Sequence, residues 1–315
     1  MLGETGDRGY YVTKETNSAG AVSALTSMRA MDTATIRPYR LEPLAAAADA
    51  LEAIPSTLRI PLAGRALGDR MFPQMAVHDR YAAATLAAIG DDGSRWTQDC
   101  YSMWGVLART RYIREQAQRF MRDYPKAHFV NIGCGLSQYF QWLDNGTTRM
   151  TDADLPEVVA LRDRLLPPLN ARQQTVTVDL TMDDWWRQLR LPRRQGRPLF
   201  LLLEGVSMYL SAGQMRNVLE TIGAYAPAGS VLVLDAFSVL ATGNAFWHPS
   251  LRNTGASIKW GLKRSDELEQ AHERFCLIDS MDIMAGYDWA NAMCSAGFTF
   301  MAGMPFYAMY VLSVE

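Results

Sequence analysis

The sequence has no apolar run of the about 18 uncharged residues that a membrane-spanning helix needs. Its four cysteines are scattered and form no C-x-x-C pair, which argues against a zinc ribbon or a redox dithiol. A net charge of −2 gives no reason to expect a nucleic acid as partner. The polar first twenty residues do not resemble a signal peptide. We therefore expect a cytoplasmic protein with neither a membrane nor a nucleic-acid partner.

Three regions of the chain differ in character. Residues 1–34 are predicted to be a flexible N-terminus. Residues 35–126 are mostly helical in pattern, as in the alanine-rich runs "LEPLAAAADALEAI" and "DRYAAATLAAIG", and are predicted to form a helical cap. From residue 127 to 315, short apolar runs alternate with helical segments. This alternation predicts an α/β domain built on a parallel, doubly wound sheet.

Five short apolar runs in this last region predict strands. They are "AHFVNI", "TRMTDA", "QTVTV", "PLFLLLEG" and "SVLVLDAF", and the unalternating ones suit strands that are buried on both faces. Helices are predicted between them, and a capping box of Ser211 and Gln214 marks the start of one. The tail "GFTFMAGMPFYAMYVLSVE" predicts two more strands joined by a turn at residues 303–305.

A glycine turn after the first predicted strand indicates a nucleoside site. Gly133 and Gly135 allow close approach of backbone, and Asp154 ends the second strand nineteen residues after Gly135. A carboxylate there can accept hydrogen bonds from both ribose hydroxyls. The alternatives are that Asp154, with Glu157, only caps a helix, and that Gly135 merely ends a strand.

The ligand at this site is not expected to be a dinucleotide. The dinucleotide fingerprint needs a third glycine three residues after the second, so that the helix can approach the strand beneath the pyrophosphate. This sequence has Gln138 at that position. S-adenosylmethionine, which has no pyrophosphate, fits the pattern better.

Six segments follow one another in a characteristic order: "ARTRYI", "FVNIGCGL", "TDADLP", "LLLEGVSMYL", "LDAFS" and "KWGL". Together they resemble the leucine carboxyl methyltransferase family, and in particular its bacterial polyketide O-methyltransferase branch. The resemblance implies a class I methyltransferase fold, which is Rossmann-like, and S-adenosyl-L-methionine as the cofactor.

The resemblance also implies roles for particular residues. The family's cofactor contacts correspond to Arg109 and Arg65 at the methionine carboxylate, Gly133 and Gly135 in the turn, Asp154 on the ribose, Asp179 and Leu180 beside adenine, and Glu204 near the methionine end. Each charged residue has an alternative role. Arg109 could be a solvated helix residue, Glu204 part of a structural ion pair, and Asp179 a helix N-cap.

Methyl transfer from a sulfonium requires alignment and exclusion of water, but not protonation of the leaving group. A carboxylate acceptor is already ionised at neutral pH, whereas a hydroxyl usually needs a general base. His248 in "AFWHPSLRN" is the candidate base, and Tyr209 is a second candidate catalytic residue. Phe246, Trp247 and Trp260 are, with Tyr209, candidate lining residues of an apolar acceptor pocket, although a place in the core is the favoured alternative for any single one of them.

The leading hypothesis is therefore an S-adenosylmethionine-dependent methyltransferase that O-methylates a carboxylate or hydroxyl of a small natural product, such as a polyketide. The alternatives are C-methylation of another secondary metabolite, methylation of a protein C-terminus, a cofactor-binding protein with altered chemistry, and a nicotinamide oxidoreductase. Binding of S-adenosylmethionine and turnover of an acceptor panel distinguish these alternatives.

Overall fold

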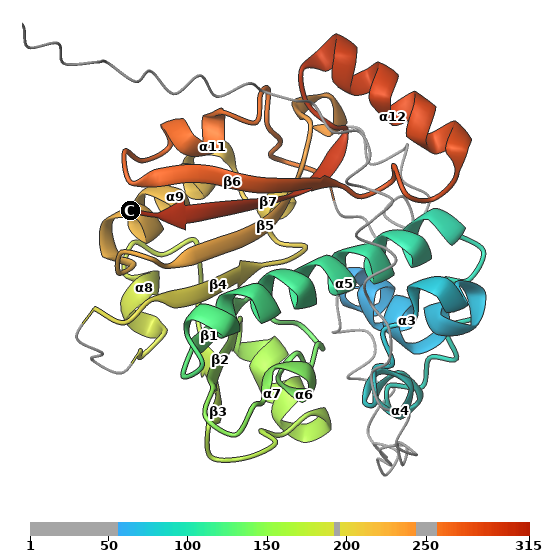
Figure 1. Cartoon of the computed structure of the whole chain (residues 1–315). Helices are drawn as coiled ribbons and strands as arrows, with labels where there is room; N and C mark the ends of the chain where they lie inside the picture. Colours follow the sequence, from blue (N-terminus) through green and yellow to red (C-terminus); the bar gives the residue numbers. More distant parts are fainter. Residues whose placement is uncertain (1–55, 192–195, 244–256) are drawn as a thin grey trace, which may run out of the picture. The chain divides into compact units, whose positions relative to one another are not determined.

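The computed structural model describes residues 56–191, 196–243 and 257–315 (Figure 1). The predicted flexible segment and the first predicted cap helix lie outside these ranges, as do His248, Phe246 and Trp247. Among the described helices, none combines the length and the apolar run that a membrane crossing needs.

The described chain is organised around a seven-stranded sheet in the order β3-β2-β1-β4-β5-β7-β6. The strands are β1 (His128–Ile132), β2 (Arg149–Asp154), β3 (Gln173–Thr177), β4 (Leu199–Leu203), β5 (Val231–Phe237), β6 (Phe275–Asp282) and β7 (Tyr307–Val314). β1 to β5 are parallel, and β7 pairs antiparallel with both β5 and β6. The five predicted parallel strands are confirmed, with their ends shifted by one or two residues.

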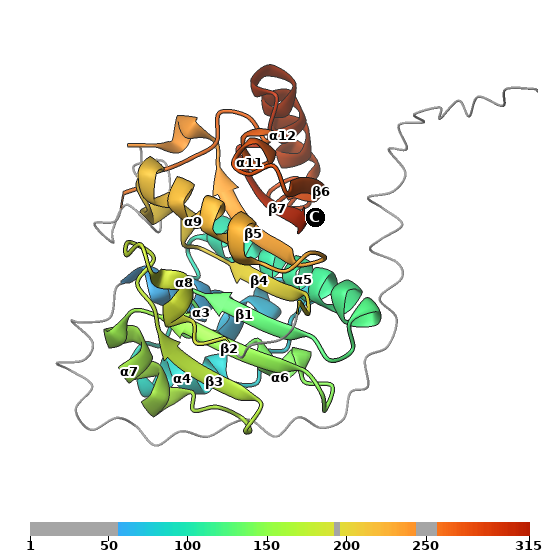
Figure 2. The ribbon, with the colours of Figure 1, turned by 90° about the vertical axis from the view of Figure 1, so that its left-hand side faces the viewer.

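Helices pack on both faces of the sheet, as the doubly wound prediction requires (Figure 2). They are α3 (Ser56–Met71), α4 (Ala82–Ala88), α5 (Cys100–Asp123), α6 (Phe140–Leu143), α7 (Pro156–Leu165), α8 (Trp185–Gln188), α9 (Ala212–Tyr225), α11 (Glu267–Gln270) and α12 (Trp289–Ala302), with 3₁₀ turns η1 (Pro73–Met75), η2 (Ser207–Tyr209) and η3 (Val239–Ala241). α5 and α6 cover the face that carries Phe129 and Phe200. α8, α9 and α11 cover the face that carries Val130 and Leu201. Neighbouring residues of a strand thus enter two separate cores, which explains the unalternating apolar runs.

The local signals at two helix starts are visible in the structure. The hydroxyl of Ser211 accepts from the Gln214 backbone N–H at 3.3 Å and the Gln214 side chain accepts from the Ser211 N–H at 2.8 Å, so the predicted capping box is confirmed. The carboxylate of Asp99 caps α5 by accepting from the Ser102 N–H at 3.0 Å. α5 is therefore fixed at its N-terminus, about two and a half turns before Arg109.

The prediction for the C-terminal tail is half wrong. Only β7 is a strand, and residues 297–302 form the last part of α12. Gly303, with φ of 74°, ends α12 in the left-handed conformation that glycine adopts at little cost. The strand that pairs with β7 is instead β6, which the sequence reading missed. β6 lies at the edge of the sheet and alternates between half-buried and exposed residues, so it lacks the continuous apolar run of the inner strands.

Candidate functional site

A cavity of about 690 Å³ opens at the carboxyl ends of the parallel strands. Open parallel sheets place their ligands at this edge. Of the ten predicted site residues, nine line this one cavity: Arg65, Arg109, Gly133, Gly135, Asp154, Asp179, Leu180, Glu204 and Tyr209. The tenth, His248, lies outside the described residues. The structure thus brings the nine together, while the role of each stays a prediction.

The turn after β1 requires glycine for a reason that the sequence did not reveal. Gly133 has φ of 69°, and a Cβ atom there would lie 2.2 Å from Cγ2 of Val206 in the loop after β4. Gly135 has φ of 49°. The backbone of the turn therefore packs directly against the side chain of Val206. A side chain at Gly133 would push the two loops apart.

Asp154 lies at the end of β2 and holds this turn. Its Oδ2 accepts from the Gly135 N–H at 2.7 Å and its Oδ1 from the Leu155 N–H at 2.8 Å. The N-cap of α7 is Leu155, with no side-chain cap, so the alternative that Asp154 caps this helix is wrong. Burial raises the pKa of the Asp154 carboxyl above its ordinary value. Each carboxylate oxygen retains a lone pair that can accept from a ligand in the cavity.

Asp179 and Leu180 lie just beyond the end of β3. Oδ1 of Asp179 accepts from the Thr181 N–H at 2.9 Å and from the Thr181 hydroxyl at 2.7 Å, which closes a tight turn. α8 begins only at Trp185, so the alternative that Asp179 is its N-cap is wrong. The buried Leu180 supplies an apolar wall to the same end of the cavity.

Arg109 and Glu204 meet across the cavity in a charged network. Nε of Arg109 lies 3.3 Å from Oε1 of Glu204, and its Nη1 lies 3.2 Å from Oδ2 of Asp235. Nη1 also donates to the hydroxyl of Tyr307, which in turn donates to Asp235. The Tyr139 hydroxyl donates to Oε2 of Glu204 at 2.7 Å. The Arg109 side chain is only 12% exposed, so the alternative of a solvated helix arginine is wrong. Glu204 does form an ion pair, as its alternative role requires.

This network has room for a further charged partner. One guanidinium faces two carboxylates, so the set carries an excess negative charge. Within the described residues, Nε of Arg109 and Oε1 of Glu204 are buried and make no hydrogen bond, although they form an ion pair. Buried polar groups normally find partners, so these two atoms mark a place for a ligand's own charged groups. An amino acid's ammonium and carboxylate would satisfy both.

Asp235 and Tyr307 are residues of the site that the sequence reading missed. An acid within the apolar run "VLVLDAF" was a usable signal for Asp235, because a buried charge must be paired. Tyr307 carried no such signal. It opens β7, stacks on Phe237 with ring centroids 3.9 Å apart, and reaches Arg109 only through the fold.

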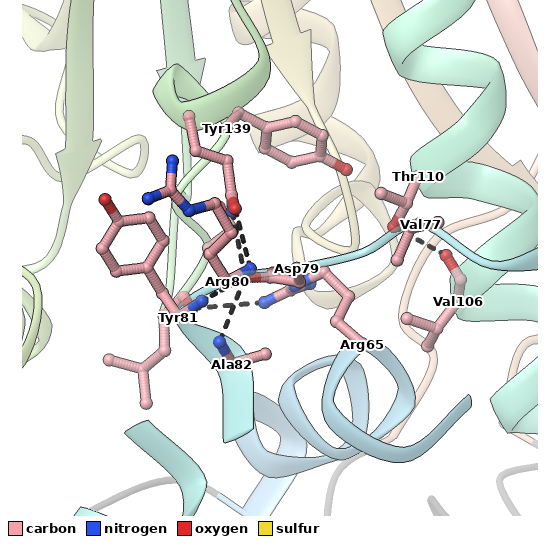
Figure 3. Close-up of polar contacts among 12 residues, drawn as sticks. Arg65, Val77, Asp79, Arg80, Tyr81, Ala82, Val106, Thr110 and Tyr139 are labelled. Carbon is pink, nitrogen blue, oxygen red and sulfur yellow. Dashed lines mark hydrogen bonds and ion pairs between the residues drawn. The ribbon is translucent and has the colours of Figure 1, made fainter. Parts of the chain in front are cut away.

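Arg65 lies on α3 and is almost fully buried. Its Nε donates to Oδ2 of Asp79 at 3.1 Å, and its Nη2 donates to the Leu136 carbonyl at 3.2 Å. Figure 3 shows Asp79 at the centre of these contacts, where it also accepts from the N–H groups of Tyr81 and Ala82. Arg65 thus joins α3 to the turn after β1. Its predicted contact with the methionine carboxylate stays a prediction.

The other end of the cavity is apolar. Its walls include Val106, Met208, Phe237, Ile283, Met284 and Phe306, with polar groups from Tyr101, Tyr209 and Asn291. Burial, helped by the Asp235 carboxylate, raises the pKa of Tyr209 to about 12. Trp260 does not line this pocket. It packs against the core between the sheet and α9, which is the core-aromatic alternative for this candidate.

Gln138 distinguishes this site from a dinucleotide site. It occupies the position of the missing third glycine, is buried, and accepts from the Gln173 side chain at 2.5 Å. A helix cannot approach the strand beneath a pyrophosphate with this side chain in place. The sheet order, the glycine turn and the acids after β2 and β3 define a class I methyltransferase fold, which is Rossmann-like.

Comparison with known proteins identifies the family. The model of the leucine carboxyl methyltransferase family matches residues 44–223, more than half of the chain. The chain belongs to this family and is an S-adenosylmethionine-dependent methyltransferase. It is 30% identical over 237 residues to the tetracenomycin polyketide synthesis O-methyltransferase TcmP of Streptomyces glaucescens, covering 73% of this chain and 85% of that protein.

More distant similarities were also found. The chain is 27% identical over 193 residues to a candidate S-adenosyl-L-methionine-dependent methyltransferase of Parafrankia sp. (strain EAN1pec), covering 55% of this chain and 60% of that protein. Among solved structures, a DUF574 family protein from Streptomyces avermitilis aligns with a TM-score of 0.49 at 15% identity, covering 80% of this chain and 97% of that chain.

Proposed function

We propose that the protein transfers a methyl group from S-adenosylmethionine to a carboxylate oxygen of a small, largely apolar natural product such as a polyketide. The observation that carries the proposal is the lining of the cavity, whose residues follow the strand order from β3 to β5. One continuous space runs from Asp179 and Leu180, past Asp154 and Glu204, to the apolar end beside Phe237. A donor and an apolar acceptor can therefore lie end to end. The similarity to an O-methyltransferase of polyketide synthesis supports the same class of acceptor.

The residues present fit the donor. Asp154 would accept from the ribose hydroxyls, Leu180 would pack against adenine, and Arg109 with Glu204 would hold the amino-acid end. When bound, S-adenosylmethionine supplies a methyl group on a sulfonium, whose leaving group is a neutral thioether. The chain's part is then to align the acceptor oxygen with this methyl group and to exclude water.

The charged groups on the cavity favour an acceptor that needs no base. Asp99 is engaged at the start of α5, where it accepts from the Ser102 hydroxyl at 2.6 Å. Glu204 is held by Arg109 and Tyr139. The lining residues within the described chain include no histidine and no lysine. A carboxylate acceptor is ionised without help, whereas a phenol or alcohol is not.

Tyr209 can orient such an acceptor. With its pKa raised to about 12, its hydroxyl stays protonated at neutral pH and can donate a hydrogen bond but cannot take a proton. Donation to the non-attacking carboxylate oxygen would fix the rotation of the acceptor. The other oxygen would then point along the line of displacement.

The experiment uses a methyl-labelled donor and matched aromatic polyketide acceptors that carry a free carboxylate, its methyl ester, or a phenol in place of the carboxylate. Methylation of the free acid gives an ester that releases labelled methanol in mild alkali, whereas ethers and C-methyl products keep the label. We expect alkali-labile label with the free acid only. Alkali-stable label from the preferred acceptor would contradict carboxylate methylation.

The candidate base His248 gives an independent test. His248→Ala should leave kcat with a carboxylate acceptor nearly unchanged, because that acceptor needs no deprotonation. A fall of about a hundredfold or more would instead favour a hydroxyl acceptor with His248 as its base. Trp260→Phe is a matched control, because Trp260 packs in the core and does not line the cavity.

A further inference from the structure

α12 differs from the other long helices in having no buried residue and no charged residue. Trp289 is 81% exposed, Met293 67%, Phe300 91% and Met301 80%. Figures 1 and 2 show α12 outside the layers formed by the sheet and the helices that cover it. Soluble monomers rarely expose an apolar patch of this size without a use for it.

The orientation of α12 is fixed by its inner side. Ser295 donates a hydrogen bond to Asp282 at the end of β6, and the ring of Phe298 packs edge-on against Phe306 at 5.5 Å. Asn291 lines the cavity. These residues follow one another at helical spacing, so the opposite side of the helix faces away from the protein. That side is an outer apolar face made by Trp289, Met293, Cys294, Ala296, Gly297, Phe300 and Met301.

The charges along the chain on both sides of α12 argue against two kinds of partner. From Phe275 to Glu315 the sequence has no lysine or arginine, and its charged residues are all acidic. An anionic membrane surface or an acidic protein would be repelled, because such partners are bound by basic residues beside the apolar ones. A partner helix that is also free of charged residues would not be repelled by α12.

We propose that the outer apolar face of α12 binds the same face of a second copy of this chain, so that the protein is a two-fold symmetric dimer. A two-fold interface joins identical patches. The large side chains stand at the two ends of the face, with Ala296 and Gly297 between them. Antiparallel packing centred between residues 294 and 295 places Trp289 of one copy beside Phe300 of the other. It also sets Met293 against Ala296, a large side chain against a small one.

The size of the face suits such an interface. An aromatic side chain buries roughly 150–250 Å², so Trp289 and Phe300 at their exposures present roughly 250–430 Å² together. This is roughly a third to a half of the ~800 Å² that each partner buries in a standard interface. Met293, Met301 and the small residues between them add to it.

Gly297 allows the interface to be tested without damaging the fold. A Cβ atom at Gly297 would meet nothing within 4 Å, and glycine weakens a helix interior. Gly297→Gln should therefore raise the unfolding temperature of the dilute monomer while it blocks close packing of two helices. Phe300→Glu places a charge in the proposed interface at a side chain that is 91% exposed in one copy. Tyr225→Glu, on α9, adds the same charge at an aromatic side chain that is 65% exposed.

The experiment is light scattering on the full chain across a concentration series. We expect a mass of twice 35.2 kDa for the wild type and for Tyr225→Glu. Phe300→Glu and Gly297→Gln should weaken the dimer by more than about tenfold. A wild type that stays monomeric at about 100 µM would overturn the proposal, whether α12 is then covered by another segment of the chain or by a different protein. A dimer that both α12 variants leave unchanged would overturn it as well.

Discussion

The proposed position of the cofactor can be tested most directly at Asp154. Its carboxylate holds the Gly135 and Leu155 N–H groups at 2.7 and 2.8 Å in the protein alone. If it also accepts from the ribose, Asp154→Ala removes charge-assisted hydrogen bonds worth about 1–3 kcal/mol in total. The Kd for S-adenosylhomocysteine, measured by calorimetry, should therefore rise roughly 5- to 150-fold. Asp163→Asn, at an exposed acid on α7, is the control and should bind normally.

A double cycle separates ribose binding from support of the turn. The second partner is a 2′-deoxy analogue of S-adenosylhomocysteine, which lacks one of the hydroxyls that Asp154 is expected to bind. If the contact exists, the losses from the variant and from the analogue should not add, because each removes the same hydrogen bond. Additive losses, or a Kd that Asp154→Ala leaves unchanged, would show that the carboxylate only supports the glycine turn.

The pH dependence of binding gives a third measurement on the same carboxylate. Burial raises its pKa, and the ionised form is the better acceptor for ribose hydroxyls. Affinity should thus fall with decreasing pH sooner than it would for a carboxyl with the ordinary value of 3.8. The stability of the free protein should show the opposite trend, because the contribution of a group with a raised pKa is present below the ordinary value and lost as pH rises through the raised one. Asp154→Ala should abolish both trends.

Three further substitutions test the rest of the site. Tyr307→Phe removes a hydrogen bond to the buried Arg109 and should lower the free energy of unfolding in urea by about 1–3 kcal/mol, with weaker cofactor binding; unchanged affinity would separate Tyr307 from the site. Tyr209→Phe should lower kcat with little effect on cofactor Kd, and the wild-type rate should show no ionisation of Tyr209 below about pH 10, since its pKa is about 12. Gly133→Ala should cost about 1–2 kcal/mol for its left-handed backbone alone, and more from the clash with Val206, so a variant of native thermal stability would refute the required turn.

The inner strands could be predicted because each neighbouring residue enters a core. Leu201 packs toward α9 while Phe200 packs toward α5, so β4 appears in the sequence as one continuous apolar run. A run this short and this uniformly apolar favours a strand buried on both faces over a helix. β6 gives no such signal, since it lies at the sheet edge and keeps exposed residues such as Ile278. Such an alternation of half-buried and exposed positions is hard to separate from a loop.

α12 was mistaken in part for a strand for a related reason. Its last turns, "GFTFMA", are rich in the aromatic and β-branched residues that favour strands, and they carry no polar face to mark a helix. A helical period can be recognised in a sequence when the solvent-exposed side of the helix is polar and the buried side is apolar. The face with Phe300 and Met301 is exposed although it is apolar, so the usual contrast between the two sides is missing. The lack of polar residues on the exposed side made the helix hard to predict, and it is also the reason to expect that a partner covers this side.

Site residues could be predicted only where their spacing along the chain is fixed by a motif. Asp154 could be found because the distance from a glycine turn to the end of the next strand is set by one crossover helix. The partners of Arg109 obey no such spacing, since Asp235 lies 126 positions and Tyr307 198 positions along the chain. Only the antiparallel return of β7 beside β5 brings them together. The charged network around Arg109 therefore depends on β5 and β7, which lie beyond residues 44–223 that match the family model.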